Sequence, residues 1–370
     1  MTIKRFVNLK RAEARRIFTT YAVVTAAYGF MQILSATGLL SSTMRGMLVP
    51  VCAYMVMAIA LNLVVGILGE LSLGHAGFMS VGAFTGVTSA IMLQNLIPFA
   101  PARLAVAMLI GSGFAAAAGF LIGIPVLRLK GDYLAIVTLA FGEIIKSVFN
   151  NFYLGMDSGG ISFSMLSDST RLLPGGRLII AGPMGIGGIQ KISTFTVGFI
   201  LVMIALAVVY NLMNSRAGRA FMAIRDDRIA AESVGINITR YKMMAFVTSA
   251  ALAGAAGALF AMNYSTIVAN KFDFNTSILV LVFVVLGGQG NILGSIVAAA
   301  ALTILPEKLR QFADYRMLLY AVVLIAGHEQ RCGEGVPDSL QPLCEACREG
   351  GRTCRLSGGR RGWFPSRPMP

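Results

Sequence analysis

Residues 214–242 read NSRAGRAFMAIRDDRIAAESVGINITRYK, and apart from the two ends this is the one long, strongly charged stretch between apolar blocks. Apolar runs flank it at 195–213 and 243–263, each near the roughly 20 residues that cross a bilayer as a helix. A charged stretch between two membrane spans must lie in water, and its basic excess places it on the cytoplasmic side. This pattern predicts a chain that crosses a membrane.

The composition of the whole chain supports this class. The chain is 56% hydrophobic and only 13% charged, with a mean hydropathy of +0.73, whereas soluble domains carry about 25% charged residues. We therefore predict an all-α polytopic membrane protein. The net charge of +14 does not indicate nucleic acid, because much of it lies in the N-terminal tail, in 214–242 and in the last part of the chain. The first two orient membrane helices.

Apolar runs outward from 214–242 predict about 8–10 transmembrane or re-entrant helices within a membrane domain, 20–326. The predicted spans are 20–40, 46–68, 71–93, 102–127, 132–152, 195–213, 243–263, 276–305 and 316–326. The basic tail 1–19 precedes them and is expected to stay in the cytoplasm. Residues 153–194 are rich in Gly, Ser and Pro and predict an irregular external loop.

Residues 276–305 are too long for one crossing and contain Gly287-Gly288-Gln289-Gly290-Asn291. Glycines and amides at membrane depth predict a broken or re-entrant helix there. If the break reaches the cytoplasm, Glu307 to Arg310 fall outside, against the positive-inside tendency; the sequence leaves this open.

The stretch 214–242 is itself patterned like folded structure. Asp226 is expected to N-cap a short helix that Gly235 ends as its C′ residue. Ala220, Ile224, Ala231 and Val234 are expected near one face. Such a helix can lie in the groove of a soluble partner. The alternative is a solvated loop whose charges only set the topology.

Three groups of polar residues are candidates for the transport pathway or its gate. Ionisable and amide groups inside membrane segments are costly and often functional. The candidates are Glu70, Ser72 and His75 in GELSLGHAGF, Glu143 and Lys146 one helical turn apart, and Gln289 and Asn291 in the helix break. Packing or gate lining is favoured over substrate contact for the first group. A structural ion pair and a polar pathway weigh equally for the second.

The chain changes character after residue 326. From Gly327 onward it has no Ile and one Val, but eight Gly, seven Arg, five Pro and four Cys. We interpret 327–370 as an atypical, disordered tail of the kind that a frameshift in a GC-rich gene produces. The alternative is a small zinc site from Cys332, Cys344, Cys347 and Cys354, but one C-x2-C without a second pair is a weak signal. The expectation is no metal and no cofactor.

Catalytic motifs are absent from the sequence. It has no G-x4-G-K-[ST] phosphate loop and no H-E-x-x-H, and no acid, base and metal-ligand set indicates an enzyme.

Four stretches resemble the LivM-type permease subunit of ABC importers for branched-chain amino acids. They are GELSLGHAGFMSVGAF at 69–84, LKGDYLAIVTLAFGEI at 129–144, 215–261, and LVLVFVVLGGQGNILGSIVAAA at 279–300 followed by DYRMLLYAVVLI at 314–325. The third carries this family's form of the E-A-A-x3-G loop, with Ile229 where the general motif has Glu. The resemblance covers about residues 45 to 326 and does not extend into the tail.

The resemblance implies a role and partners. Two permease subunits, this type and a second shorter homologue, would form the channel in the bacterial inner membrane. Substrate would cross it by alternating access. Two cytoplasmic ATP-binding subunits would dock on a cytoplasmic coupling helix, and a periplasmic binding protein would deliver substrate. The coupling residues would be Arg225, Asp226, Asp227, Ala230, Ala231, Glu232 and Gly235.

Two alternatives stay open. One is a permease of the same class for urea or short amides. The other is an ATP-independent secondary transporter or channel, in which 214–242 is only a connector. Deleting Asp226 to Gly235 separates the ABC permeases from the ATP-independent transporter, because only an ABC permease needs that segment for uptake.

Overall fold

Long apolar helices account for most of the part of the chain that the computed structural model describes, namely residues 3–38, 41–94, 96–129, 132–157, 160–164 and 177–308. The predicted span 316–326, the tail 327–370 with its four cysteines, and Lys130 lie outside these residues. All described residues belong to one compact unit.

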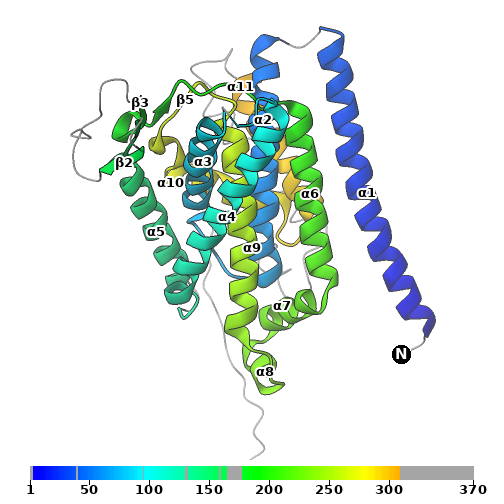
Figure 1. Cartoon of the computed structure of the whole chain (residues 1–370). Coiled ribbons are helices and arrows are strands. Elements are labelled where there is room, and N and C mark those ends of the chain that lie inside the picture. The colour runs from blue at the N-terminus through cyan, green and yellow to red at the C-terminus, as the bar shows by residue number, and fades with distance from the viewer. Residues whose placement is uncertain are drawn as a thin grey trace, which may run out of the picture. The chain divides into compact units, whose positions relative to one another are not determined.

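Short connections join most of the helices, whereas the stretch between α5 and α6 contains the strands β1 to β4 (Figure 1). The described helices and strands are α1 Ile3–Ala36, α2 Ser42–Asn62, a π-helix Leu63–Leu68, α3 His75–Met92, α4 Ala100–Val126, α5 Asp132–Asn150, β1 Tyr153–Asp157, β2 Gly160–Ser164, β3 Arg177–Ala181, a 3-10 turn Gly182–Met184, β4 Ile186–Gly187, α6 Phe195–Asn214, α7 Arg216–Asp226, α8 Arg228–Ser233, α9 Ile238–Ala261, β5 Thr266–Ile267, a 3-10 turn Ala269–Phe272, α10 Phe274–Gly287 and α11 Ile292–Lys308.

Seven helical segments within the described residues are long and apolar enough to cross a membrane. They are Ile17–Ala36, Ser42–Leu68, Ala100–Val126, Tyr133–Asn150, Phe195–Asn214, Ile238–Ala261 and Ala269–Gly287. Helix α3 is not among them, although most of its residues are buried, and α11 is a shorter apolar helix. The prediction of a polytopic helical membrane protein is confirmed.

Small residues hold the centre of the fold together. Helix α9 packs against both α3 and α4, where a Cβ at Gly82 would run into the backbone of Gly254 and one at Gly257 into the carbonyl of Met79. Without side chains at these points the helix backbones approach closely, which is how membrane helices gain packing energy that lipid does not supply.

The predicted break in 276–305 is present. Helix α10 ends at Gly287 and α11 begins at Ile292, and Gly288 and Gly290 between them have φ of 91° and 82°. This left-handed backbone suits glycine, which has no Cβ to clash. The predicted break therefore follows from two glycines in an apolar run.

The prediction of an irregular loop at 153–194 was wrong for the parts that form strands, whereas residues 188–194 are irregular. Strand β1 pairs antiparallel with β2 and β3, and β4 pairs with β5, which lies beyond α9. Backbone hydrogen bonds to partner strands give order to these short segments despite their many turn residues, and pairing between distant segments leaves no local signal in composition.

Candidate functional site

The stretch 214–242 folds into two short helices and the start of a third. Ser215 caps α7 by accepting from the backbone N–H groups of Ala217 and Gly218 at 3.1 and 3.4 Å. Asp227 caps α8, because its Oδ1 accepts from the N–H groups of Ile229 and Ala230 at 2.8 and 3.0 Å. Side-chain oxygens here satisfy N–H groups that have no partner within the helix.

The predicted N-cap at Asp226 was therefore wrong by one residue. Asp226 is the last residue of α7, and the chain leaves the helix at Asp227, where φ and ψ are −151° and 110°. Two adjacent aspartates offer the same capping chemistry, so the backbone path alone decides which one caps.

The other end of α8 agrees with the prediction. Gly235 has a φ of 87°, and the N–H of Ile236 donates to the carbonyl of Ala231 at 3.1 Å, as in a helix stop with glycine at C′. Asn237 then caps α9 by accepting from the N–H of Arg240 at 3.1 Å.

The exposed surface of α8 is partly apolar. The side chains of Ile229 and Val234 are 81% and 80% exposed, and Ala230 and Glu232 are exposed as well. The predicted common face was wrong, because the segment forms two helices: Ala220 and Ile224 are buried on α7 and Ala231 on α8, whereas Val234, which follows the last residue of α8, is exposed.

Helix α7 is anchored to the membrane helices at two points. Phe221 is buried, and its ring meets that of Tyr241 on α9 edge to face. Arg225 donates from Nη1 to the carbonyl oxygen of Gly66 at 2.7 Å, and Gly66 lies in the π-helix that ends α2.

The connection 69–74, which follows that π-helix, carries the first group of candidate residues. Glu70 forms an ion pair with Lys242, whose side chain is 2% exposed against 16% for Glu70. Lys242 was predicted to lie in water with the rest of 214–242, and that prediction was wrong. Helix α9 begins at Ile238, so Lys242 lies one turn inside it and is buried against the connection.

Ser72 and His75 belong to a second buried set of polar groups. Nδ1 of His75 is 3.1 Å from Oγ of Ser72, and Nε2 is 2.7 Å from Oγ of Ser249 on α9. Ser249 in turn donates to the carbonyl of Ala60 on α2 at 2.6 Å. The backbone N–H of Leu73 donates to Oγ1 of Thr138 on α5 at 3.1 Å. The connection 69–74 is thus bonded to α5 and α9.

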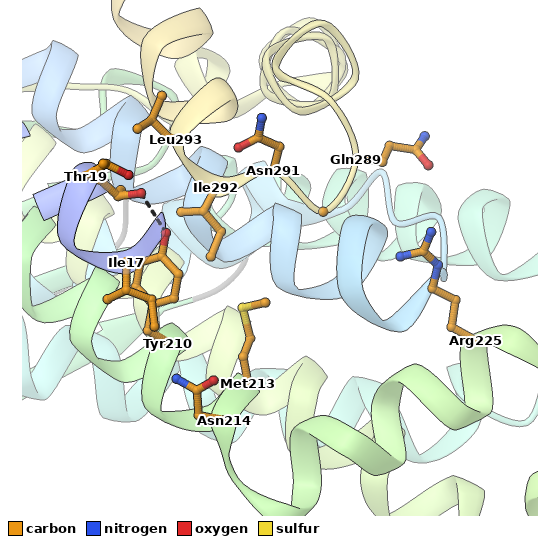
Figure 2. A pocket seen from close by; sticks show the side chains of 12 residues that line it. Ile17, Thr19, Tyr210, Met213, Asn214, Arg225, Gln289, Asn291, Ile292 and Leu293 are labelled. Atoms are coloured by element: carbon orange, nitrogen blue, oxygen red, sulfur yellow. Dashed lines mark hydrogen bonds between the residues drawn. The ribbon is translucent and has the colours of Figure 1, made fainter. Parts of the chain in front are cut away.

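Gln289 and Asn291 line a cavity of about 760 Å³ together with Arg225. Figure 2 shows the break between α10 and α11 beside the Arg225 side chain, with Tyr210 and Met213 of α6 on the opposite wall. Asn291 also caps α11, because its Oδ1 accepts from the N–H of Gly294 at 3.3 Å. The residues that line the cavity are Ile17, Thr19, Thr20, Tyr210, Met213, Asn214, Arg225, Gln289, Gly290, Asn291, Ile292 and Leu293.

Glu143 and Lys146 form a separate pair on α5. Their Oε2 and Nζ atoms are 3.1 Å apart, with side chains 44% and 23% exposed. Oε1 of Glu143 also accepts from the N–H of Phe274 at 3.1 Å. This carboxylate therefore connects α5 to the first turn of α10 and not to the connection 69–74.

Four residues that make contacts in this site were not predicted as site residues from the sequence: Asn62, Gly66, Lys242 and Ser249. Asn62 carried a usable signal, because it is a lone amide inside the apolar run 46–68. Gly66 and Ser249 carried none, since their roles depend on which helix faces them. Among the described residues, no group of three or more His, Cys, Asp or Glu could hold a metal ion.

Comparisons with known proteins place the sequence in a family. Residues 43–327 match the family model described as branched-chain amino acid transport system, permease component. The chain is 36% identical over 325 residues to the high-affinity branched-chain amino acid transport system permease protein LivM of Salmonella typhimurium strain LT2, which covers 82% of this chain and 70% of the relative.

Two further relatives support the same assignment. LivM of Escherichia coli K12 is 37% identical over 282 residues, covering 74% of this chain and 65% of the relative. LivH of S. typhimurium is 24% identical over 258 residues, covering 67% and 79%. No solved structure matches the chain significantly. The family match extends over most of the chain, so the chain belongs to the branched-chain amino acid transport system permease family.

Proposed function

We propose that this chain is the permease subunit of an ABC importer in a bacterial inner membrane, with its N-terminus in the cytoplasm. It would carry branched-chain amino acids inward by alternating access together with a second permease subunit. Two cytoplasmic ATP-binding subunits would supply the energy, and a periplasmic binding protein would deliver the amino acid. No nucleic acid is involved.

The observation that carries this proposal is the charged, capped segment α7–α8 in a chain of this family. Its helices are N-capped by Ser215 and Asp227, so the segment has a defined shape outside the apolar spans. Two large apolar side chains, Ile229 and Val234, are about four-fifths exposed on it. Exposed apolar groups on a rigid helix favour docking into an apolar groove.

Basic residues support the orientation. Arg216, Arg219, Arg225, Arg228 and Arg240 lie in the segment 214–242, and cytoplasmic loops carry such an excess. Docking of the ATP-binding subunits on α8 would then place the cavity beside Arg225 on the cytoplasmic side, where a transported amino acid leaves.

The test uses the chain expressed with the four other subunits of its transport system. The variant Ile229→Asp/Val234→Asp places charges at the docking surface, and Ser233→Asp is the matched control, since Ser233 is exposed on the same helix. We expect the double variant to reach the membrane, to lose co-purified ATP-binding subunits and to lose uptake of radiolabelled leucine at least tenfold. The control should keep both.

Other outcomes distinguish the alternatives. Leucine uptake that persists without ATP-binding subunits would establish an ATP-independent transporter or channel. ATP-dependent uptake of urea or acetamide without uptake of leucine would establish an amide permease.

A further inference from the structure

The C-terminal end of α2 is held by a residue from the proposed docking segment. The last carbonyls of a helix have no partner within it, and they carry the negative end of the helix dipole. The guanidinium of Arg225 satisfies one of them, the carbonyl of Gly66, at 2.7 Å. Gly69, which follows with a φ of 79°, lies against the same side chain, because a Cβ there would be 3.0 Å from Cγ of Arg225.

The same end of α2 is bonded to the break between α10 and α11. Asn62 is fully buried, and its Oδ1 accepts from the N–H of Gly290 at 2.9 Å. Its Nδ2 donates to Oγ of Ser295 on α11 at 2.9 Å, and that hydroxyl donates to the carbonyl of Asn291 at 3.1 Å. One amide therefore ties α2 to the break and to the first turn of α11.

Packing leaves little free space between Gly66, Asn62 and the break. A Cβ at Gly66 would collide with the N–H of Gly290 and with the side chain of Asn62. A Cβ at Gly290 would come 3.8 Å from Nη1 of Arg225. Bonded and closely packed groups of this kind move together, because packed interiors transmit displacement.

The backbone at this junction is of the kind that rearranges. The π-helix Leu63–Leu68 directly continues α2, and π-helical turns occur frequently at functional sites. Gly288 and Gly290 both have positive φ, and residues at the ends of elements are where hinge motions take up changes in φ and ψ.

From these contacts we infer that Arg225 is the positioning residue that couples α7–α8 to the break between α10 and α11 through the π-helix Leu63–Leu68. When the partner docked on α8 displaces α7, the carbonyl of Gly66 moves with Arg225, and Asn62 passes that movement to Gly290 and Ser295. The break opens or closes the cavity that Gln289 and Asn291 line. The inference rests on the proposed function and adds the route by which docking reaches the pathway.

Helix α7 has a second attachment, which separates coupling from folding. The ring of Phe221 packs on Tyr241 and fixes α7 to α9. Loss of the Arg225 bond therefore leaves α7 in place while releasing α2. A merely structural Arg225 would lower protein yield and every activity together.

The experiment compares Arg225→Met, Arg225→Lys and the control Arg219→Met in the complete transport complex, purified and reconstituted in proteoliposomes. Arg219 is exposed on the same helix. Three quantities are measured: co-purified ATP-binding subunits, ATP hydrolysis with leucine-loaded binding protein, and leucine taken up per ATP hydrolysed.

We expect Arg225→Met to keep the ATP-binding subunits and to keep hydrolysis within about twofold, while uptake per ATP falls at least about tenfold, the scale of a lost charged hydrogen bond. Arg225→Lys keeps one donor and the aliphatic stem against Gly69, so a fall of about threefold is expected. Arg219→Met should match the unaltered complex. If Arg225→Met does not fold, Arg225→Lys carries the test.

A direct readout follows the movement itself. Spin labels placed one at a time on Glu232→Cys and Gln289→Cys, both exposed positions, report through their mobility whether α8 and the break each respond to ATP. With Arg225 present both sites should respond to ATP together, and with Arg225→Met the label at 289 should no longer respond.

Two results would overturn the inference: unchanged uptake per ATP in Arg225→Met, or a loss of ATP-binding subunits that explains the lost uptake. Failure of the proposed function looks different, because the unaltered complex would then take up leucine without ATP-binding subunits or not at all.

Discussion

The ion pair between Glu70 and Lys242 allows a prediction in which the two partners respond unequally. The side chain of Lys242 is 2% exposed and that of Glu70 is 16% exposed. Glu70→Ala leaves a buried ammonium without its carboxylate, which costs about 3–5 kcal/mol. Lys242→Met leaves a carboxylate that water can reach in part, so the cost is nearer about 1–3 kcal/mol.

The double variant tests whether the two side chains act as one unit. With both charges removed no buried charge is left unpaired, and replacing a buried pair by apolar groups is often close to neutral. We therefore expect Glu70→Ala/Lys242→Met to cost less than Glu70→Ala alone. The coupling between the two sites should be about 3 kcal/mol, within the upper range for residues in contact.

Heating the detergent-solubilised protein and measuring the fraction that remains monodisperse gives an apparent Tm. At about 2 °C per kcal/mol for a large domain, Glu70→Ala should lower Tm by about 6–10 °C and Lys242→Met by about 2–6 °C. Lys146→Met breaks the more exposed pair with Glu143 and should lower it by at most about 2 °C. Additive losses in the double variant would refute the reasoning, because independent side chains do not form a pair.

Three further substitutions follow from the same contacts. Gly82→Ala should cost about 1–3 kcal/mol of stability, because its Cβ meets the backbone of Gly254. Gly113→Ala, with nothing within 4 Å of its Cβ, should instead gain up to about 1 kcal/mol. The opposite ranking of the two variants in the heating assay would contradict the packing argument. Asp227→Ala removes the cap of α8 and should weaken it by about 1 kcal/mol, seen as faster amide exchange in 228–233, and an equal effect of Asp226→Ala would show that the cap was misassigned. Asn62→Ala leaves the N–H of Gly290 unpaired and should cost about 1–3 kcal/mol, and an unchanged apparent Tm would exclude that bond.

Local patterns were sufficient for the course of the chain through its helices. Each described span is a continuous apolar run of its own, so its position does not depend on its neighbours. The break was predictable because Gly288 and Gly290 interrupt such a run, and the end of α8 because Gly235 follows it. The choice between Asp226 and Asp227 was not predictable, since both carry the capping group.

The candidate site was only half predictable. Glu70, His75 and Arg225 stood out as ionisable groups in or beside apolar helices, but their partners did not. Glu70 and Lys242 are 172 residues apart in the sequence, and Arg225 and Gly66 are 159 apart. In the sequence, Lys242 is one more basic residue of a charged stretch. In the structure, α9 begins four residues earlier, at Ile238, and carries Lys242 into a buried position.

The sequence by itself therefore determined the class of protein, the order of its helices and the presence of a capped, charged segment between two of them. These properties follow from hydrophobicity and capping chemistry, which act over a few neighbouring residues. The tertiary structure alone decided that Arg225 meets the carbonyl of Gly66 and that Asn62 bonds to Gly290. Such contacts depend on how helices distant in the chain pack, and a backbone carbonyl has no side-chain identity for a sequence pattern to reveal.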